Sequence, residues 1–214
     1  MPTDLALFYA PGACSLAPHI ALEETGVPFT PVAVDLKTGE QRRPGYLEIN
    51  PKGRVPTLRV DGWALTENPA ILQFIGRAFP EARLWPEDLR AAARAAEWMA
   101  WLSSTVHVAY AHMRRAERYA TSDQALEDVR AKGRESCAAL WPAVEAAFGA
   151  GPWALGDRYS VVDSYLMVFW TWGRGPALGF DMPSLFPRWT AQARRMAARP
   201  AVERAFRREG LDLP

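Results

Sequence analysis

A cysteine with small neighbours, at the start of an expected helix, is the first residue in this sequence that could do chemistry. Cys14 lies in the segment YAPGACSLAPHIALEE, residues 9–24. A helix start presents unpaired backbone N–H groups and the positive end of the helix dipole, which favour a thiolate and attract an anionic sulfur ligand. The turn Pro11-Gly12-Ala13 is small enough for a ligand to approach the backbone. The plain alternative is that Cys14 is a buried packing residue.

Four other candidate residues occupy comparable positions. Ser15 could cap the helix or donate a hydrogen bond to a neighbouring thiolate. Glu67 and Asn68 lie between an expected strand and an expected helix, where backbone N–H groups can hold a carboxylate while Glu67 receives an ammonium. They could equally be a capping pair. His107 lies on a long expected helix, as a functional residue or simply as a packed or solvated side chain.

The elements that must position Cys14 form a β-α-β unit with a parallel, right-handed crossover. We expect a strand over Leu5–Tyr9, a helix over Ser15–Thr25 that ends at Gly26, and a strand over Phe29–Val34 with Pro31 at a sheet edge.

The next segment predicts a hairpin and a second helix. A polar loop, with one irregular helical turn near residues 46–49, leads to a strand over Arg54–Val60, a turn at Asp61-Gly62, a strand over Ala64–Thr66 and a helix from the N-cap Asn68 to Phe79. A cis Val55–Pro56 bond is open at this point, because only about 5–6 % of X–Pro bonds are cis.

The remainder of the chain contains no convincing strand. We expect a domain over residues 1–80, a linker over 81–87 and an all-helical domain over 88–214. Apolar periodicity indicates helices over 87–119 and 123–148, the second bent or shortened by Pro142. Ser160 and Asp163 form a capping-box pattern before a very apolar helix that runs to Trp170. Two more helices cover residues 184–198 and 201–208. Most tryptophans here are expected in the core, although Trp101 and Tyr110 could line an apolar pocket.

Composition limits the possible partners. The chain has 214 residues, 49 % of them hydrophobic, and a net charge of +1, which gives no reason to expect nucleic acid or an anionic membrane. Its two cysteines are too far apart in sequence to suggest a disulfide framework or a metal site. The first residues, MPTD, lack the pattern of a signal peptide, and the longest apolar run is far shorter than a membrane span. We therefore expect a soluble, cytoplasmic protein without a metal.

Five segments, in this order and spacing, resemble the glutathione S-transferases, most closely the bacterial beta class. They are YAPGACSLAPHIALEE at 9–24, INPKGRVPTL at 49–58, LTENPAIL at 65–72, EWMAWLSSTVH at 97–107 and GDRYSVVDSYL at 156–166. The resemblance implies a thioredoxin-like β-α-β-α-β-β-α domain, followed by a helical bundle that contributes the second-substrate pocket. It also implies a homodimer that uses glutathione as cosubstrate.

The resemblance assigns roles to individual residues. It implies that Pro56 is cis, so that the backbone of Val55 pairs with the cysteinyl part of glutathione. Glu67 and Asn68 would take the γ-glutamyl end, with Asn68 standing where the family usually has Ser. Cys14 matches a cysteine that can form a mixed disulfide with glutathione.

The same resemblance outlines the second-substrate pocket. His107 matches a histidine near this pocket, and Ser104, one turn earlier, is expected to contact glutathione. Val108 replaces a common Lys and makes that wall more apolar. Ala13, Trp101, Val108 and Tyr110 are the expected lining residues.

The expected activity is transfer of glutathione to small apolar electrophiles by an activated thiolate, with Cys14, Ser15 and His107 as catalytic residues. Thiol–disulfide exchange through Cys14 is an equally open chemistry, with thiol transferase or peroxidase side activity. The rival hypothesis is a non-catalytic binding or interaction module on the same fold, since fold alone does not fix function.

Overall fold

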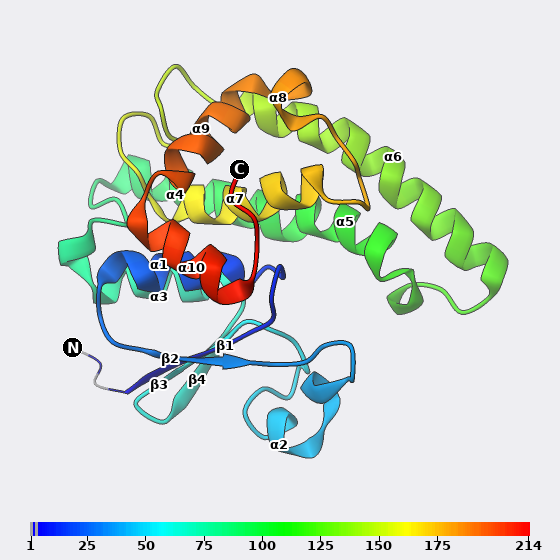
Figure 1. Ribbon diagram of the computed structural model, residues 1–214, viewed down its shortest axis with the longest axis horizontal. Coiled ribbons are helices and arrows are strands. Elements are labelled where there is room, and N and C mark those ends of the chain that lie inside the picture. The colour runs from blue at the N-terminus through cyan, green and yellow to red at the C-terminus, as the bar shows by residue number, and fades with distance from the viewer. Residues whose placement is uncertain (1, 3) are drawn as a thin grey trace.

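The structure, a computed structural model, describes residue 2 and residues 4–214; Met1 and Thr3, part of the MPTD segment, lie outside the described residues. The N-terminal part is built on a four-stranded sheet with the order β2-β1-β3-β4 (Figure 1). β1 is parallel to β2 and antiparallel to β3, and β3 is antiparallel to β4, so the expected crossover and hairpin are confirmed. The strands are β1 Leu5–Tyr9, β2 Thr30–Ala33, β3 Thr57–Val60 and β4 Trp63–Thr66.

The two faces of the sheet contact different cores, because successive side chains of a strand point to opposite sides. Leu5, Leu7 and Tyr9 belong to the large core that the sheet shares with the helices. The second cluster, beside the short helix α2 (Pro44–Leu47), is small and consists of Ala6, Phe8, Val34 and Tyr46.

Helix α1 (Leu16–Thr25) lies between the sheet and the helical part, so nearly all of it is buried (Figure 1). It ends as expected at Gly26, whose φ of 70° is the left-handed conformation that glycine adopts without strain. Helix α3 (Asn68–Ala78) packs beside α1. Both helices therefore begin after a strand and place their N-termini above the sheet.

The rest of the chain is helical. Its helices are α4 Leu89–Trp101, α5 His107–Arg114, α6 Asp123–Ala147, α7 Val161–Arg174, α8 Met182–Leu185, α9 Pro187–Ala197 and α10 Pro200–Glu209. Short 3₁₀ turns occur at Glu40–Arg42, Pro80–Ala82 and Ala116–Arg118. Helix α7 is the buried centre, and it starts with the predicted capping box, in which Ser160 and Asp163 bond each other's backbone N–H groups. The predicted fold class is thus confirmed.

Three helices differ from the prediction. The one expected over 184–198 is divided at Phe186 into α8 and α9. The helix expected over 87–119 ends at Arg114 and contains a π-helical turn, Leu102–Val106, between α4 and α5. Pro142 does not shorten α6, which runs for 25 residues to Ala147. Because Pro142 has no backbone N–H, the carbonyl of Ala138 lacks its helical hydrogen bond. Both residues lie on the exposed side of α6, where water can replace that bond.

The N-terminal and helical parts share one continuous core, in which α1 and α3 pack against α7. The domain limits 1–80, 81–87 and 88–214 stay a prediction. Among the described residues, no helix combines the length and apolar character that a membrane crossing requires.

Candidate active site

The loop that carries Cys14 is closed by the side chain of Ser15. The Ser15 Oγ accepts a hydrogen bond from the backbone N–H of Ala10 at 3.1 Å and donates to the carbonyl of the same residue at 3.2 Å. The side chain is fully buried and makes no capping bond to α1. Ser15 therefore does not cap α1 but stabilises the loop, and its role as a donor to a thiolate stays a prediction.

Distant residues hold the same loop at Gly12. The N–H of Gly12 donates to Glu209 Oε2 at 2.9 Å, and its carbonyl accepts from Trp172 Nε1 at 2.9 Å. The other oxygen of Glu209 lies 2.7 Å from Nδ1 of His19, and both side chains are fully buried. Glu209 and Trp172 were missed by sequence reasoning, because no local pattern announces contacts made from 160 or more residues away.

Cys14 is a protonated thiol in this geometry. Burial raises its pKa to about 12, although its own backbone N–H, the side chain of Asn68 and the charge of Arg118 act in the opposite direction. Its Sγ lies 3.6 Å from the carbonyl oxygen of Val55, to which the thiol donates. Burial thus opposes the thiolate that the helix start was expected to favour, and α1 itself begins at Leu16, two residues after Cys14.

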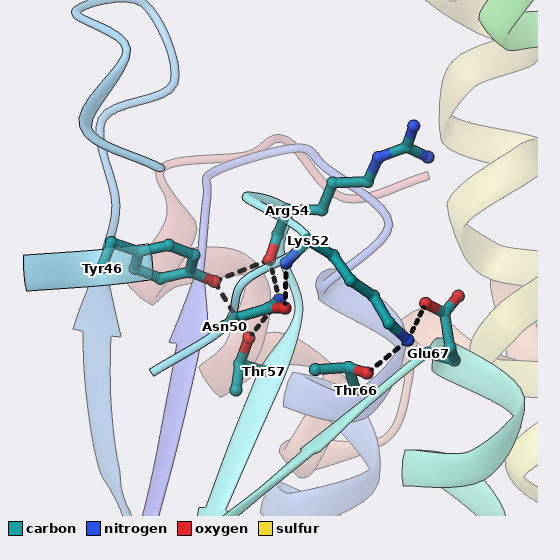
Figure 2. Close-up of polar contacts among 7 residues, drawn as sticks. All are labelled: Tyr46, Asn50, Lys52, Arg54, Thr57, Thr66 and Glu67. Carbon is teal, nitrogen blue, oxygen red and sulfur yellow. Dashed lines mark hydrogen bonds and ion pairs between the residues drawn. The ribbon is translucent and has the colours of Figure 1, made fainter. Parts of the chain in front are cut away.

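A buried polar cluster fixes the backbone at Val55, whose bond to Pro56 is cis as the resemblance implied. The Tyr46 hydroxyl donates to the Arg54 carbonyl at 2.7 Å and lies 3.0 Å from Thr57 Oγ1 (Figure 2). Nδ2 of Asn50 bonds both of these acceptors. These hydrogen bonds to Arg54 and Thr57 therefore fix the backbone on both sides of Val55.

The second helix start also uses its side chains internally. Nδ2 of Asn68 donates to the Cys14 carbonyl at 3.0 Å, so the side chain joins the two loops. Helix α3 begins one residue earlier than predicted, with Glu67 as N-cap at a φ of 72°, an uncommon value for a side-chain-bearing residue. Figure 2 shows Lys52 reaching Glu67, with Nζ 2.8 Å from the carboxylate. The Glu67 carboxylate, which was expected to receive the ammonium of a ligand, is therefore already paired with the ammonium of Lys52.

His107 and Tyr110 form an aromatic wall from the helical part. Burial, followed by the charges of Arg118 and Arg54, lowers the pKa of His107 to about 4, so its imidazole is neutral near pH 7. Its ring packs against Phe169 and Trp172. The Tyr110 ring stacks on Trp172, with centroids 4.2 Å apart and an interplanar angle of 13°.

These walls enclose a cleft of about 1450 Å³. Five predicted site residues line it: Ala13, Cys14, Val55, His107 and Tyr110. The other predicted binding and pocket residues do not line it: Pro56, Glu67, Asn68, Ser104, Trp101 and Val108. Ser104 is exposed, and Trp101 packs against Trp98. Within the described residues, no group of three His, Cys, Asp or Glu side chains could hold a metal ion.

Comparison with known proteins identifies the family. The profile for "Glutathione S-transferase, N-terminal domain" matches residues 3–77. Glutathione S-transferase GST-4.5 of Xanthomonas campestris pv. campestris is 33 % identical over 209 residues, which cover 97 % of this chain and 100 % of that protein. Glutathione S-transferase GstA of Escherichia coli O157:H7 is also 33 % identical, over 210 residues that cover 97 % of this chain and 100 % of that protein.

Solved structures agree. A glutathione transferase homologue from Sulfitobacter with bound glutathione is 40 % identical, with a TM-score of 0.91 and coverage of 98 % and 99 %. A beta-class enzyme from Sphingomonas chungbukensis is 37 % identical, with a TM-score of 0.82 and coverage of 97 % and 100 %. The chain belongs to the glutathione S-transferase family, and the family and enzyme class implied by the sequence are confirmed.

Proposed function

We propose that this enzyme transfers glutathione to small electrophiles, with the glutathione sulfur beside Cys14 and Val55. Glutathione is the cosubstrate. The observation that carries the proposal is the single cleft onto which the Cys14 loop, the Val55 edge and the His107 wall all open. Family membership and the glutathione bound to the Sulfitobacter homologue support it.

The thioredoxin-like wall offers groups for two of the three parts of glutathione, the cysteinyl part and the γ-glutamyl part. The backbone of Val55, exposed by the cis bond to Pro56, pairs with the cysteinyl part. The N-terminus of α3 takes the γ-glutamyl carboxylate, and Glu67 takes the ammonium in place of Lys52. Because this ion pair is largely exposed, displacing it costs at most about 1 kcal/mol. Asn68 acts by fixing the Cys14 loop.

The chemistry in this proposal is nucleophilic attack. The glutathione thiol loses its proton to solvent, its sulfur forms a bond to an electrophilic carbon, and the leaving group departs with the electron pair of the broken bond. The neutral imidazole of His107 can donate an N–H to the sulfur, and Tyr110 supplies a flat surface for the electrophile.

Thiol–disulfide exchange at Cys14 ranks second. The Cys14 thiolate would attack oxidised glutathione, form a mixed disulfide and release one glutathione thiolate. A pKa of about 12 leaves little of this thiolate near pH 7, which favours conjugation as the main reaction.

The proposal includes a cytoplasmic homodimer, supported by family membership alone. Ser104 is exposed outside the cleft, so it can contact glutathione only across a subunit interface.

The test is calorimetric titration of glutathione into the wild type and Cys14→Ala, followed by initial rates with 1-chloro-2,4-dinitrobenzene. We expect binding to both proteins and conjugation by the wild type. Intact mass after incubation with oxidised glutathione reports any adduct on Cys14. Absence of both binding and adduct would end the enzyme proposal. Binding without conjugation, but with reduction of mixed disulfides, would replace it by thiol transfer, and binding without either reaction would favour the non-catalytic module.

A further inference from the structure

Four of the five arginines that line the cleft are close enough to Cys14, His107 or Tyr110 to affect the pKa of those side chains. Arg54 comes from the thioredoxin-like part, and Arg114, Arg115 and Arg118 come from the end of α5 and the 3₁₀ turn that follows it. Within the part of the chain that the structure describes, none of the four forms an ion pair with a carboxylate. Figure 2 shows the Arg54 side chain extending away from the Tyr46 and Asn50 cluster that binds its carbonyl. Arg115 also donates a hydrogen bond to the Arg114 carbonyl at 3.2 Å, which does not neutralise its charge.

The positive charge is concentrated in the cleft. Seven Lys or Arg residues but three Asp or Glu residues line it, whereas the whole chain has a net charge of +1. Two of the three carboxylates, Asp35 and Glu40, accept hydrogen bonds from backbone N–H groups of their own loop. Clefts lined by one sign of charge raise the local concentration of ligands of the opposite sign. The third carboxylate, Glu117, is adjacent to Arg118 in sequence and is exposed.

The arginines act on one another and on the reacting groups. Partial burial and the charges of Arg54 and Arg115 lower the pKa of the Arg118 guanidinium. Arg118 also acts on the pKa of Cys14 and of His107. Like charges are therefore held close together near the thiol, and Glu117, whose charge acts on Arg118 in the opposite direction, balances them only in part. A bound anion would relieve this repulsion and gain charge-assisted hydrogen bonds.

An aromatic surface lies next to these cations. Tyr110 stacks on Trp172. Burial raises the pKa of its hydroxyl, and the nearby charges of Arg114 and Arg115 act in the opposite direction. A planar molecule on Tyr110 would present its edge to the arginines. The cleft thus offers a flat apolar surface and a cationic rim in one place.

Building on the proposed function, we propose that the physiological electrophile is a planar molecule with a carboxylate or similar anionic group, which Arg115 and Arg118 bind while Tyr110 holds its ring. Glutathione carries carboxylates of its own, so its binding must be measured separately.

The experiment compares two electrophiles that differ at one group, the anionic 4-chloro-3,5-dinitrobenzoate and the neutral 4-chloro-3,5-dinitrobenzamide. In both, the glutathione sulfur forms a bond to the ring carbon that loses chloride, and the thiol proton goes to solvent. The readout is the ratio of kcat/KM for the acid to that for the amide, because any effect on glutathione activation cancels in this ratio. We expect Arg118→Gln to lower the ratio about tenfold. Arg130→Gln, an equal charge change on the exposed face of α6, should leave it unchanged.

Added salt should lower the wild-type ratio, because the charges of the cleft are screened. An unchanged ratio in Arg118→Gln would overturn the proposal. If the main effect of Arg118→Gln were a rise in the KM for glutathione, the proposal would also be overturned, because the arginines would then bind the cosubstrate. A wild type that turns over neither electrophile would contradict the proposed function itself, whereas turnover of the amide with an unaltered ratio contradicts only the anionic substrate.

Discussion

The two walls of the cleft are built in different ways. The thioredoxin-like wall presents backbone groups at Val55 and at the start of α3, and partly buried hydrogen bonds to Gly12, Arg54 and Cys14 fix the loops around them. The helical wall presents side chains, mainly His107, Tyr110 and the arginines around Arg118. A fixed backbone suits one invariant ligand, and a side-chain wall can change its specificity by substitution. We therefore expect glutathione to depend on the first wall and the electrophile to depend on the second.

The largest expected effect comes from removing the buried support of the first wall. Glu209→Ala leaves the Gly12 N–H and the His19 ring without their acceptor, and we expect the free energy of unfolding to fall by about 3 kcal/mol. Urea denaturation measures this change, and the KM for glutathione should rise in the folded variant. Glu209→Gln is the matched control, since its amide can still accept from Gly12. Equal stability of Glu209→Ala and the wild type would show that the wall does not depend on this contact.

A smaller effect should follow from Asn68→Ala, which removes the bond between Asn68 Nδ2 and the Cys14 carbonyl. A lost buried hydrogen bond costs about 1–2 kcal/mol, so we expect a rise of roughly tenfold in the KM for glutathione. The KM for a neutral electrophile should stay within about twofold. Steady-state kinetics with each substrate varied in turn makes the measurement. If the electrophile KM changed as much as the glutathione KM, the two walls would not be separable.

The converse test is on the helical wall. Tyr110→Ala removes the ring on which the electrophile is proposed to stack, a contact worth about 1 kcal/mol, so the KM for an aromatic electrophile should rise about fivefold. Tyr110→Phe keeps the ring and should behave like the wild type. The same kinetic series provides the data, and a predominant change in glutathione KM would be inconsistent with the comparison.

The smallest effect concerns pH. Since the pKa of His107 is lowered to about 4, its imidazole stays neutral above about pH 5, and the pH profile of kcat/KM should show no inflection near the ordinary histidine value of about 6.5. His107→Asn should therefore change the height of the profile and leave its shape. The unfolded chain binds the proton more readily, so stability should decrease as the pH falls from about 6.5 towards 4. An inflection near pH 6.5 that disappears in His107→Asn would contradict a neutral imidazole.

Local signals made much of the fold predictable. Gly26 ends α1, Asp61-Gly62 turns the hairpin, and Ser160 with Asp163 caps α7, because each depends on residues a few positions apart. The cis bond at Pro56 required the family resemblance, since the sequence alone did not favour it.

What the sequence did not predict depends on distant contacts. The raised pKa of Cys14 follows from burial in the assembled protein. The hydrogen bond from Gly12 to Glu209 connects residues near opposite ends of the sequence. The gathering of Arg54 with Arg118 brings together two residues that neither composition nor periodicity connects. Both walls therefore contain features that only the assembled fold creates.

The most direct test of the account is whether the cleft activates the glutathione thiol. In Cys14→Ala, saturated with glutathione, the only protein thiol is Cys137, whose pKa burial raises to about 12, so thiolate absorbance at lower pH reports glutathione. The same titration with S-methylglutathione subtracts the protein signal. We predict that the thiolate appears at least about one pKa unit below the ordinary thiol value of about 8.5. A titration that matches free glutathione would contradict the account.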